Sequence, residues 1–332
     1  MIFLAIFFAL LIEQVRQLGA HSAPHQLARL WVAQVLRSCD AGSVGAARLA
    51  WALAVLLPAA LALLAHHLLL MGGNWLAWAG LLALHVGVLY LTLGFRQFSA
   101  YFSRIRDALD AGDEENARSI LAKWVYITPS PLGGQAMPRS DSLRSVLAQA
   151  GLSAHIHVFG VIVAYGLGAL LGLGPAGAVA YRLCELLARS CDHAEKKIPN
   201  PLADKHPISL PMRSAAKTAW RLLDWLPARC TAMLYAIVGN FEDAIASWRA
   251  QTQAAAAAQT PVENSQIVIS AAAGAIGVQM VAASDALESS PSASTDLNPP
   301  QLGHLQAMVG LVWRSVVVAM TLLALLTIAG MV

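Results

Sequence analysis

Three long apolar runs constrain the fold of this chain more than any other feature. They are Trp51–Leu70, Trp75–Phe95 and Val309–Val332, and only Arg314 interrupts the last of them near its start. A helix needs about 20 mostly apolar residues to cross the hydrocarbon core of a bilayer, and each run reaches that length. Only 12% of the residues are charged, about half of the share usual in soluble domains. The sequence therefore predicts an all-α, polytopic helical membrane protein.

Two further apolar segments are less regular. Residues 1–12 are apolar but short, and no small-residue cleavage site follows them. We interpret them as an uncleaved, marginal span rather than as a signal peptide. The second segment, 155–187, is interrupted by Gly172–Pro175. Because proline disfavours the helical region for the residue before it, we expect the helix to stop there.

The distribution of Lys and Arg predicts the topology. These residues gather in segments 13–50, 96–154 and 178–308, whereas the turn Met71–Asn74 has none. Cationic loops stay on the cytoplasmic side of the membrane. A single crossing at 155–177 would place the basic segment from 178 onward outside, so we predict a broken helical hairpin that returns to the cytoplasmic side.

The chain is thus expected to have six parts, with cytoplasmic amphipathic helices between its membrane segments. The parts are N-terminal membrane helices (1–95), a cytoplasmic helix–turn–helix and loop (96–154), the broken membrane hairpin (155–187), cytoplasmic or interfacial helices (188–280), a mobile loop (281–308) and a C-terminal transmembrane helix (309–332). The net charge of +3 does not suggest nucleic-acid binding. The lipid bilayer is the expected partner.

The segment after the second span reads as two helices joined by a tight turn. Gly112 suits the position just past the first helix, and Asp113 suits the N-cap of the second, with two glutamates in its first turn. The charges are most simply a solvated face, while metal or phosphate handling remains the alternative. Residues 127–142, rich in Pro, Gly and Ser, are expected to form a loop.

A second amphipathic region, Met212–Arg249, contains the run Asp224-Trp-Leu-Pro-Ala-Arg229. Pro227 fits the first turn of a helix and Gly239 fits its end. One interpretation is a kink between interfacial helices. The other places the Arg229 cation against a phosphate.

The histidines and cysteines offer weaker signals. His66 and His67 lie in a predicted span, where polar residues often mark function, but they are near its end and could reach the interface. His155 and His157 would diverge on a helix, so a shared metal is not expected. The four cysteines are interpreted as small buried side chains in a reducing compartment.

Several motifs resemble the CobD/CbiB family. Asp224–Leu234 resembles its N-x-x-P-A-R-L-T-A signature, and Leu109–Arg118 its a-L-x-x-G-D-l-x-x-A-R element. Gly174–Tyr181 resembles its G-P-x-g-a-x-x-Y turn, and Ala271–Gln279 its a-A-M-A-G-A-L-G-V stretch. The elements occur in family order over roughly residues 85–280.

The resemblance implies a multi-pass protein of the bacterial inner membrane that acts in cobalamin biosynthesis. Such proteins join adenosylcobyric acid to aminopropanol or its phosphate and use ATP and Mg²⁺, so a corrinoid and an amino alcohol are the implied partners. By resemblance, the catalytic candidates are Asp113, Asp224 and Arg229, and the substrate-binding candidates are Arg118, Asn264, Gly274 and Gly277. The metal ligands and the oligomeric state stay open, a homo-oligomer included.

The chain departs from the family pattern in places. Gly151–Gly160 stands where the family has an acidic E-S-x-x-E-N-x-x-D-G run, and Leu183–Arg189 replaces an N-T-L-D-S-M-V-G-Y-like segment. The apolar opening that ends in Glu13 resembles the AmpE-like branch of the same superfamily, which is linked to β-lactamase induction. A non-catalytic, AmpE-like regulatory protein is therefore the alternative.

Overall fold

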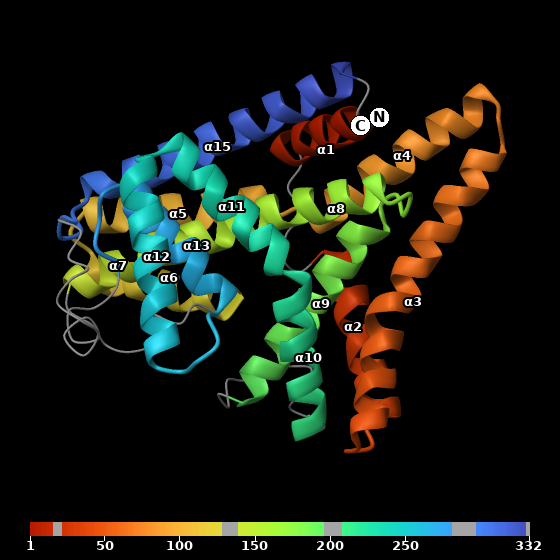
Figure 1. The fold of residues 1–332 in the computed structure, drawn as a ribbon, viewed down its shortest axis with the longest axis horizontal. Coiled ribbons are helices and arrows are strands. Elements are labelled where there is room, and N and C mark those ends of the chain that lie inside the picture. Colours follow the sequence, from red (N-terminus) through yellow and green to blue (C-terminus); the bar gives the residue numbers. More distant parts are fainter. Residues whose placement is uncertain (16–21, 128–138, 196–207, 281–296, 330–332) are drawn as a thin grey trace. The chain divides into compact units, whose positions relative to one another are not determined.

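The computed structural model describes the chain except for residues 16–21, 128–138, 196–207, 281–296 and 330–332 (Figure 1). The described ranges are helical and contain no strand, only an isolated bridge between Val278 and Asn298. They fall into two compact units. The first comprises 1–94, 160–224 and 323–332, and the second comprises 95–159 and 225–322.

The predicted fold class is confirmed. Four helical runs are long and apolar enough to cross a membrane: Val44–Met71, Trp75–Thr92, Ser142–Leu170 and Gly303–Ile328. Protein buries most of the third run, whereas the other three leave most of their side chains exposed. The N-terminal helix α1 (Ile2–Val15) has 14 residues, about 21 Å, which is short of the roughly 30 Å core of a bilayer.

Seven helices lie within the described residues of the first unit. They are α1, α2 (Ala23–Cys39), α3 (Val44–Met71), α4 (Trp75–Thr92), α8 (Gly160–Leu170), α9 (Ala176–Glu195) and α10 (Leu210–Leu223). Helices α3 and α4 form a hairpin because Asn74 caps α4, its side chain accepting a hydrogen bond from the Ala77 N–H at 2.8 Å. A core of small and branched side chains joins α2, α3, α9 and α10, with Val32, Ala50 and Leu187 at its centre.

Helices α8 and α9 pack against each other as a hairpin. Its turn lies at the predicted break, where Gly172 and Gly174 adopt positive φ angles of 73° and 53°. Gly177 lies so close to the Ala164 carbonyl that an added Cβ would overlap it. The absence of a side chain therefore lets the two helix backbones approach at this point.

The second unit is built around a buried helix. Its elements are α5 (Phe95–Asp110), α6 (Glu114–Ile127), α7 (Arg139–Ala154), the π-helical turn η1 (His155–Phe159), α11 (Trp225–Val238), α12 (Phe241–Ala257), α13 (Asn264–Ala275) and most of α15 (Gly303–Ile328). Helix α13 packs on α7, α11 and α12 and is buried along nearly its whole length.

The structure differs from the expected boundaries in two places. Of the loop expected at 127–142, residues 128–138 lie outside the described ranges and residues 139–142 begin α7 (Arg139–Ala154), which η1 joins to α8 without a break. Polar side chains on this helix bond to one another, as Gln149 does to Ser153 at 3.3 Å, which allows their burial. In the segment 281–308, residues 281–296 lie outside the described ranges, and α15 already begins at Gly303.

Candidate functional site

Asp224 lies at the end of α10 in the first unit, where its own N–H caps the helix by bonding to the Trp220 carbonyl. Its side chain is 2% exposed and accepts a hydrogen bond from the hydroxyl of Tyr181 on α9 at 2.9 Å. Gly160 makes room for this tyrosine, because an added Cβ there would overlap the Tyr181 hydroxyl. The carboxylate of Asp224 is therefore held by a second element of the family resemblance, the G-P-x-g-a-x-x-Y turn.

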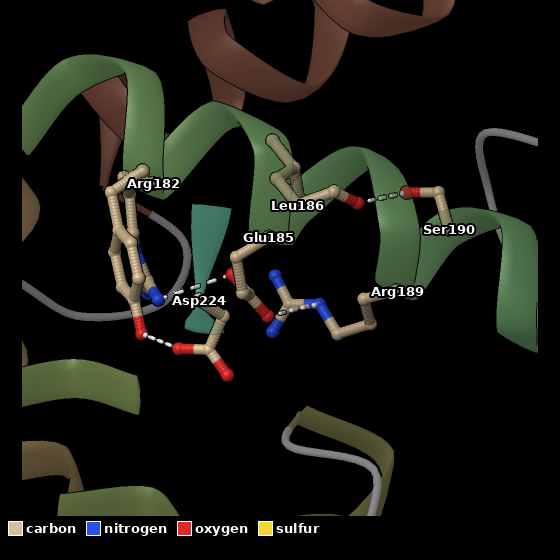
Figure 2. A network of polar contacts seen from close by, with 7 residues as sticks. Arg182, Glu185, Leu186, Arg189, Ser190 and Asp224 are labelled. Atoms are coloured by element: carbon tan, nitrogen blue, oxygen red, sulfur yellow. Dashed lines mark hydrogen bonds and ion pairs between the residues drawn. The ribbon is translucent and has the colours of Figure 1, made fainter. Parts of the chain in front are cut away.

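Next to Asp224, three charged side chains line one face of α9 (Figure 2). Arg182 Nη1 lies 3.1 Å from one oxygen of Glu185, and Arg189 Nε lies 3.5 Å from the other. The side chains are only 14%, 5% and 12% exposed for Arg182, Glu185 and Arg189. Spacings of three and four residues place them on the same helix face. Since both guanidinium groups share one carboxylate, the group is cationic as a whole.

The positive charges of Arg182 and Arg189 on α9 affect the pKa of a histidine on α2. Burial, together with the charges of Arg182, Arg29 and Arg189, lowers the pKa of His25 to about 4. Guanidinium groups bind carboxylates and phosphates through paired hydrogen bonds. The face of α9 toward α2 is therefore suited to a phosphate-bearing group.

No motif in the sequence indicates Arg182, Glu185 or Arg189 as site residues. The available signal is their spacing on one face of an amphipathic helix, at and just before the segment Leu183–Arg189 that replaces the family's N-T-L-D-S-M-V-G-Y-like run. Tyr181 was noted only as part of a turn motif, and its contact with Asp224 depends on packing between α9 and α10.

In the second unit, two predicted site residues are in contact. Arg229, in the first turns of α11, donates from Nη1 to the Trp225 carbonyl at 2.8 Å and to Asn264 Oδ1 at 3.4 Å. Its guanidinium also lies 4.1 Å from the centre of the Trp225 ring. Asn264 is the first residue of α13 and is 5% exposed. Trp225 of α11 and Asn264 at the start of α13 thus together position the guanidinium of Arg229.

Contacts with η1 and α7 fix helix α11 in place. Thr231 donates its hydroxyl proton to the Pro227 carbonyl at 3.0 Å, so its oxygen accepts from Nδ1 of His155 at 2.9 Å. Tyr235 donates to the Gly151 carbonyl at 3.0 Å. His155 and Gly151 both belong to the segment Gly151–Gly160, which stands in place of the family's acidic run. In this chain that segment therefore supports helix α11.

Asp113 and Arg118 lie around the start of α6. Asp113 caps the helix, accepting a hydrogen bond from the Asn116 N–H at 3.0 Å, and Gly112 before it has a φ of 76°. Arg118 Nη2 lies 3.3 Å from Glu114 Oε2, and its side chain is 45% exposed. Residues of α5, α6 and α7 line a small pocket here: Leu109, Glu114, Ala117, Arg118, Leu121, Ser142 and Val146. The predicted cap is confirmed, whereas a catalytic role for Asp113 remains a prediction.

The two glycines predicted to bind substrate have structural roles. An added Cβ on Gly274 would overlap the Asp243 backbone, so this glycine allows α13 to approach α12. Gly277 has a φ of 68°, and its carbonyl accepts a hydrogen bond from the Asn298 N–H at 3.0 Å. Substrate binding by either glycine remains a prediction.

The described parts of the chain contain no group of three or more His, Cys, Asp or Glu residues that could hold a metal ion. Mg²⁺ bound to a nucleotide needs only one or two carboxylates, because phosphates and water supply its other ligands. Glu114 is half-buried at the pocket edge beside Arg118. A carboxylate next to a guanidinium fits a Mg²⁺–phosphate group.

Comparisons with known proteins extend the motif resemblance to most of the chain. No family model and no solved structure matches it. The chain is 30% identical over 271 residues, 80% of its length, to "Cobalamin biosynthesis protein CobD" of Stutzerimonas stutzeri strain A1501 and covers 77% of that protein. It is 29% identical over 195 residues, 59% of its length, to the protein of the same name from Chromobacterium violaceum and covers 54% of it. With this extent of identity to the first of these relatives, the chain belongs to the CobD/CbiB family.

Proposed function

We propose that this chain acts in cobalamin biosynthesis as a membrane-embedded synthase. It joins a carboxylate of adenosylcobyric acid to the amine of aminopropanol or its O-phosphate and consumes ATP. The observation that carries the proposal is the similarity to a CobD protein over 80% of the chain. The four candidate spans support a multi-pass location, which we assign to the bacterial inner membrane.

Amide formation requires the corrinoid carboxylate to be activated by phosphoryl transfer from ATP before the amine attacks and releases phosphate. Fixed cations stabilise the charge that develops on the transferring group. Arg229 is suited to this role because Trp225 and Asn264 hold its guanidinium in one orientation. Arg118 and Glu114 at the start of α6 are proposed to bind the nucleotide phosphates and Mg²⁺.

Asp224 has a separate proposed role in the first unit. Its buried carboxylate, hydrogen-bonded to Tyr181, is suited to accept a proton or to orient an amine. The cationic face of α9 is suited to the phosphate of an aminopropanol phosphate. The AmpE-like alternative rests on the missing acidic run and on the apolar opening that ends in Glu13, and the comparisons give it no support.

The test is an assay of the purified full chain in lipid nanodiscs. Adenosylcobyric acid, ATP–Mg²⁺ and either aminopropanol or its phosphate are supplied, and the amide product and ADP are quantified by mass spectrometry. We expect ADP and amide in equal amounts. We expect Arg229→Gln to lower kcat about 10²-fold or more, as for loss of a donor that stabilises transition-state charge.

The matched control is Arg249→Gln, which removes an exposed arginine from α12 in the same unit. Its turnover should equal that of the unmodified chain. Absence of amide with both amino alcohols, from protein that melts cooperatively, would contradict the proposal.

A further inference from the structure

Three polar side chains form a hydrogen-bonded chain inside the apolar helices of the first unit. Nδ1 of His66 on α3 lies 2.9 Å from Nε2 of His85 on α4. Nδ1 of His85 lies 2.6 Å from the hydroxyl of Tyr165 on α8. All three residues belong to candidate membrane spans. Polar groups at such positions are costly in lipid and commonly mark a function.

The exposed fraction of the side chain increases along this hydrogen-bonded series, from Tyr165 through His85 to His66. Tyr165 is 0% exposed and His85 is 4% exposed. His66 is half-buried, and its neighbour His67 is exposed. His66 lies near the end of α3, before the Met71–Asn74 turn that lacks cations. The hydrogen-bonded series therefore runs from His66, near the end of a span, to the buried side chain of Tyr165.

The turn between α8 and α9 packs against the imidazole of His66, the more exposed of the two histidines. Gly174 lies against the His66 ring, since an added Cβ would be 2.7 Å from Cγ of that histidine. Its φ of 53° also favours glycine. The hairpin turn thus holds His66 in the orientation that directs Nδ1 toward His85.

The two hydrogen bonds can hold one additional proton without breaking. In one neutral arrangement, Nδ1–H of His66 donates to Nε2 of His85, and Nδ1–H of His85 donates to the Tyr165 oxygen. A proton from water forms an N–H bond at Nε2 of His66. The Nδ1–H bond of His66 then breaks as a new N–H bond forms at Nε2 of His85. The resulting His85 cation donates to both neighbours, and every heteroatom contact is retained.

We propose that His66, His85 and Tyr165 form a proton-binding site within the membrane, which is loaded through His66 and holds the proton on His85. This site lies outside the synthase residues named above. The described residues include no group of three or more metal-ligating side chains, so a proton fits the site better than a metal ion.

Other titratable groups lie on the helices packed around His85. They include Arg48 and His67 of α3, Tyr90 of α4 itself, Glu13 of α1 with the amino group of Met1 before that helix, and Tyr181, Arg182, Cys184, Glu185, Arg189, Cys191, Asp192 and His193 of α9. The proton is therefore assigned by following individual residues rather than the charge of the whole protein.

The experiment is a pH titration of the full chain, labelled with ¹⁵N-histidine, in lipid nanodiscs. We expect His66 to change from the Nδ1–H to the Nε2–H tautomer at the same midpoint at which His85 becomes doubly protonated. His85→Gln should abolish the tautomer change of His66. Tyr165→Phe, which changes only the hydroxyl, should leave neutral His85 in a mixture of tautomers. His67→Gln is the control and should leave the coupled transition unchanged.

Separate midpoints for His66 and His85 would overturn the proposal, as would a Tyr165→Phe variant with an unchanged His85 tautomer. Stoichiometric binding of Zn²⁺ that is lost in His85→Gln would also overturn it, in favour of a metal site. The titration involves no turnover, so its outcome is independent of the synthase assay.

Discussion

At the scale of single residues, contacts between neighbours in the sequence were predictable, whereas contacts between distant residues were not. The Asp113 cap was predictable because its contacts lie within a few residues of it. The Arg229–Asn264 contact spans 35 positions and required the packing of α11 on α13. The resemblance had selected both residues, but neither spacing nor periodicity indicates such a pair.

Glu185 is expected to be important for stability because its single carboxylate is paired with two buried guanidinium groups. Glu185→Gln removes the negative charge that both guanidinium groups share, and breaking a buried ion pair in this way costs about 3 kcal/mol or more. Thermal unfolding of the detergent-solubilised protein measures the effect. Asp110→Asn removes an exposed carboxylate from α5 and is the control. Equal melting temperatures for the two variants would contradict the buried network.

His25 should make the folded state sensitive to acid. Burial and the nearby arginines lower its pKa to about 4, whereas the unfolded chain has the ordinary value of about 6.5. Between these values unfolding takes up a proton, so stability is lost as the pH falls from about 6.5 toward 4. Unfolding at about pH 7.5 and about pH 5 should show a larger loss for the unmodified chain than for His25→Gln. Identical losses would exclude a half-buried His25 that is neutral in the folded state.

At the scale of helices, the position at which a helix ends was easier to predict than the continuation of one helix into the next. The α8–α9 turn was predictable from Gly172–Pro175, because proline and glycine act on the local backbone. The continuity of α7, η1 and α8 was not, since the polar residues of 139–154 resemble a loop segment. Their burial depends on partners from α5, α6 and α13, which are distant in sequence.

Gly177 is expected to control the packing of the α8–α9 hairpin. Gly177→Ala places a methyl group against the Ala164 carbonyl, and such overpacking costs about 1–3 kcal/mol. Gly166→Ala is the matched control, because an added Cβ on this α8 glycine meets no atom within 4 Å. A melting-temperature series measures both variants. If Gly177→Ala melts no lower than Gly166→Ala, the close approach of the helices is incorrect.

At the scale of the whole molecule, composition and run length were sufficient for the fold class. Apolar runs of membrane length require no tertiary information, and all three that were identified coincide with candidate spans. The division into two units was not predictable, because each unit combines segments from different parts of the chain. The positive-inside distribution predicts a topology that remains to be measured.

Cysteine labelling of cells tests that topology. In a chain with Cys39 and Cys230 changed to Ser, we expect Arg249→Cys to react only after the membrane is permeabilised, because Lys and Arg stay inside. Gly73→Cys, in the cation-free turn after α3, should react in intact cells. Labelling of position 249 in intact cells would contradict the cytoplasmic return of the hairpin.

Genetic complementation tests the central claim most directly. This chain is expressed in a cobalamin-producing bacterium from which its own CobD protein has been deleted, in a strain chosen because it makes no cobinamide. The account predicts that cobinamide synthesis returns with the unmodified chain and with Arg249→Gln, but not with Arg229→Gln at equal membrane abundance. Failure of the abundant, unmodified chain to restore cobinamide, or full restoration by Arg229→Gln, would contradict it.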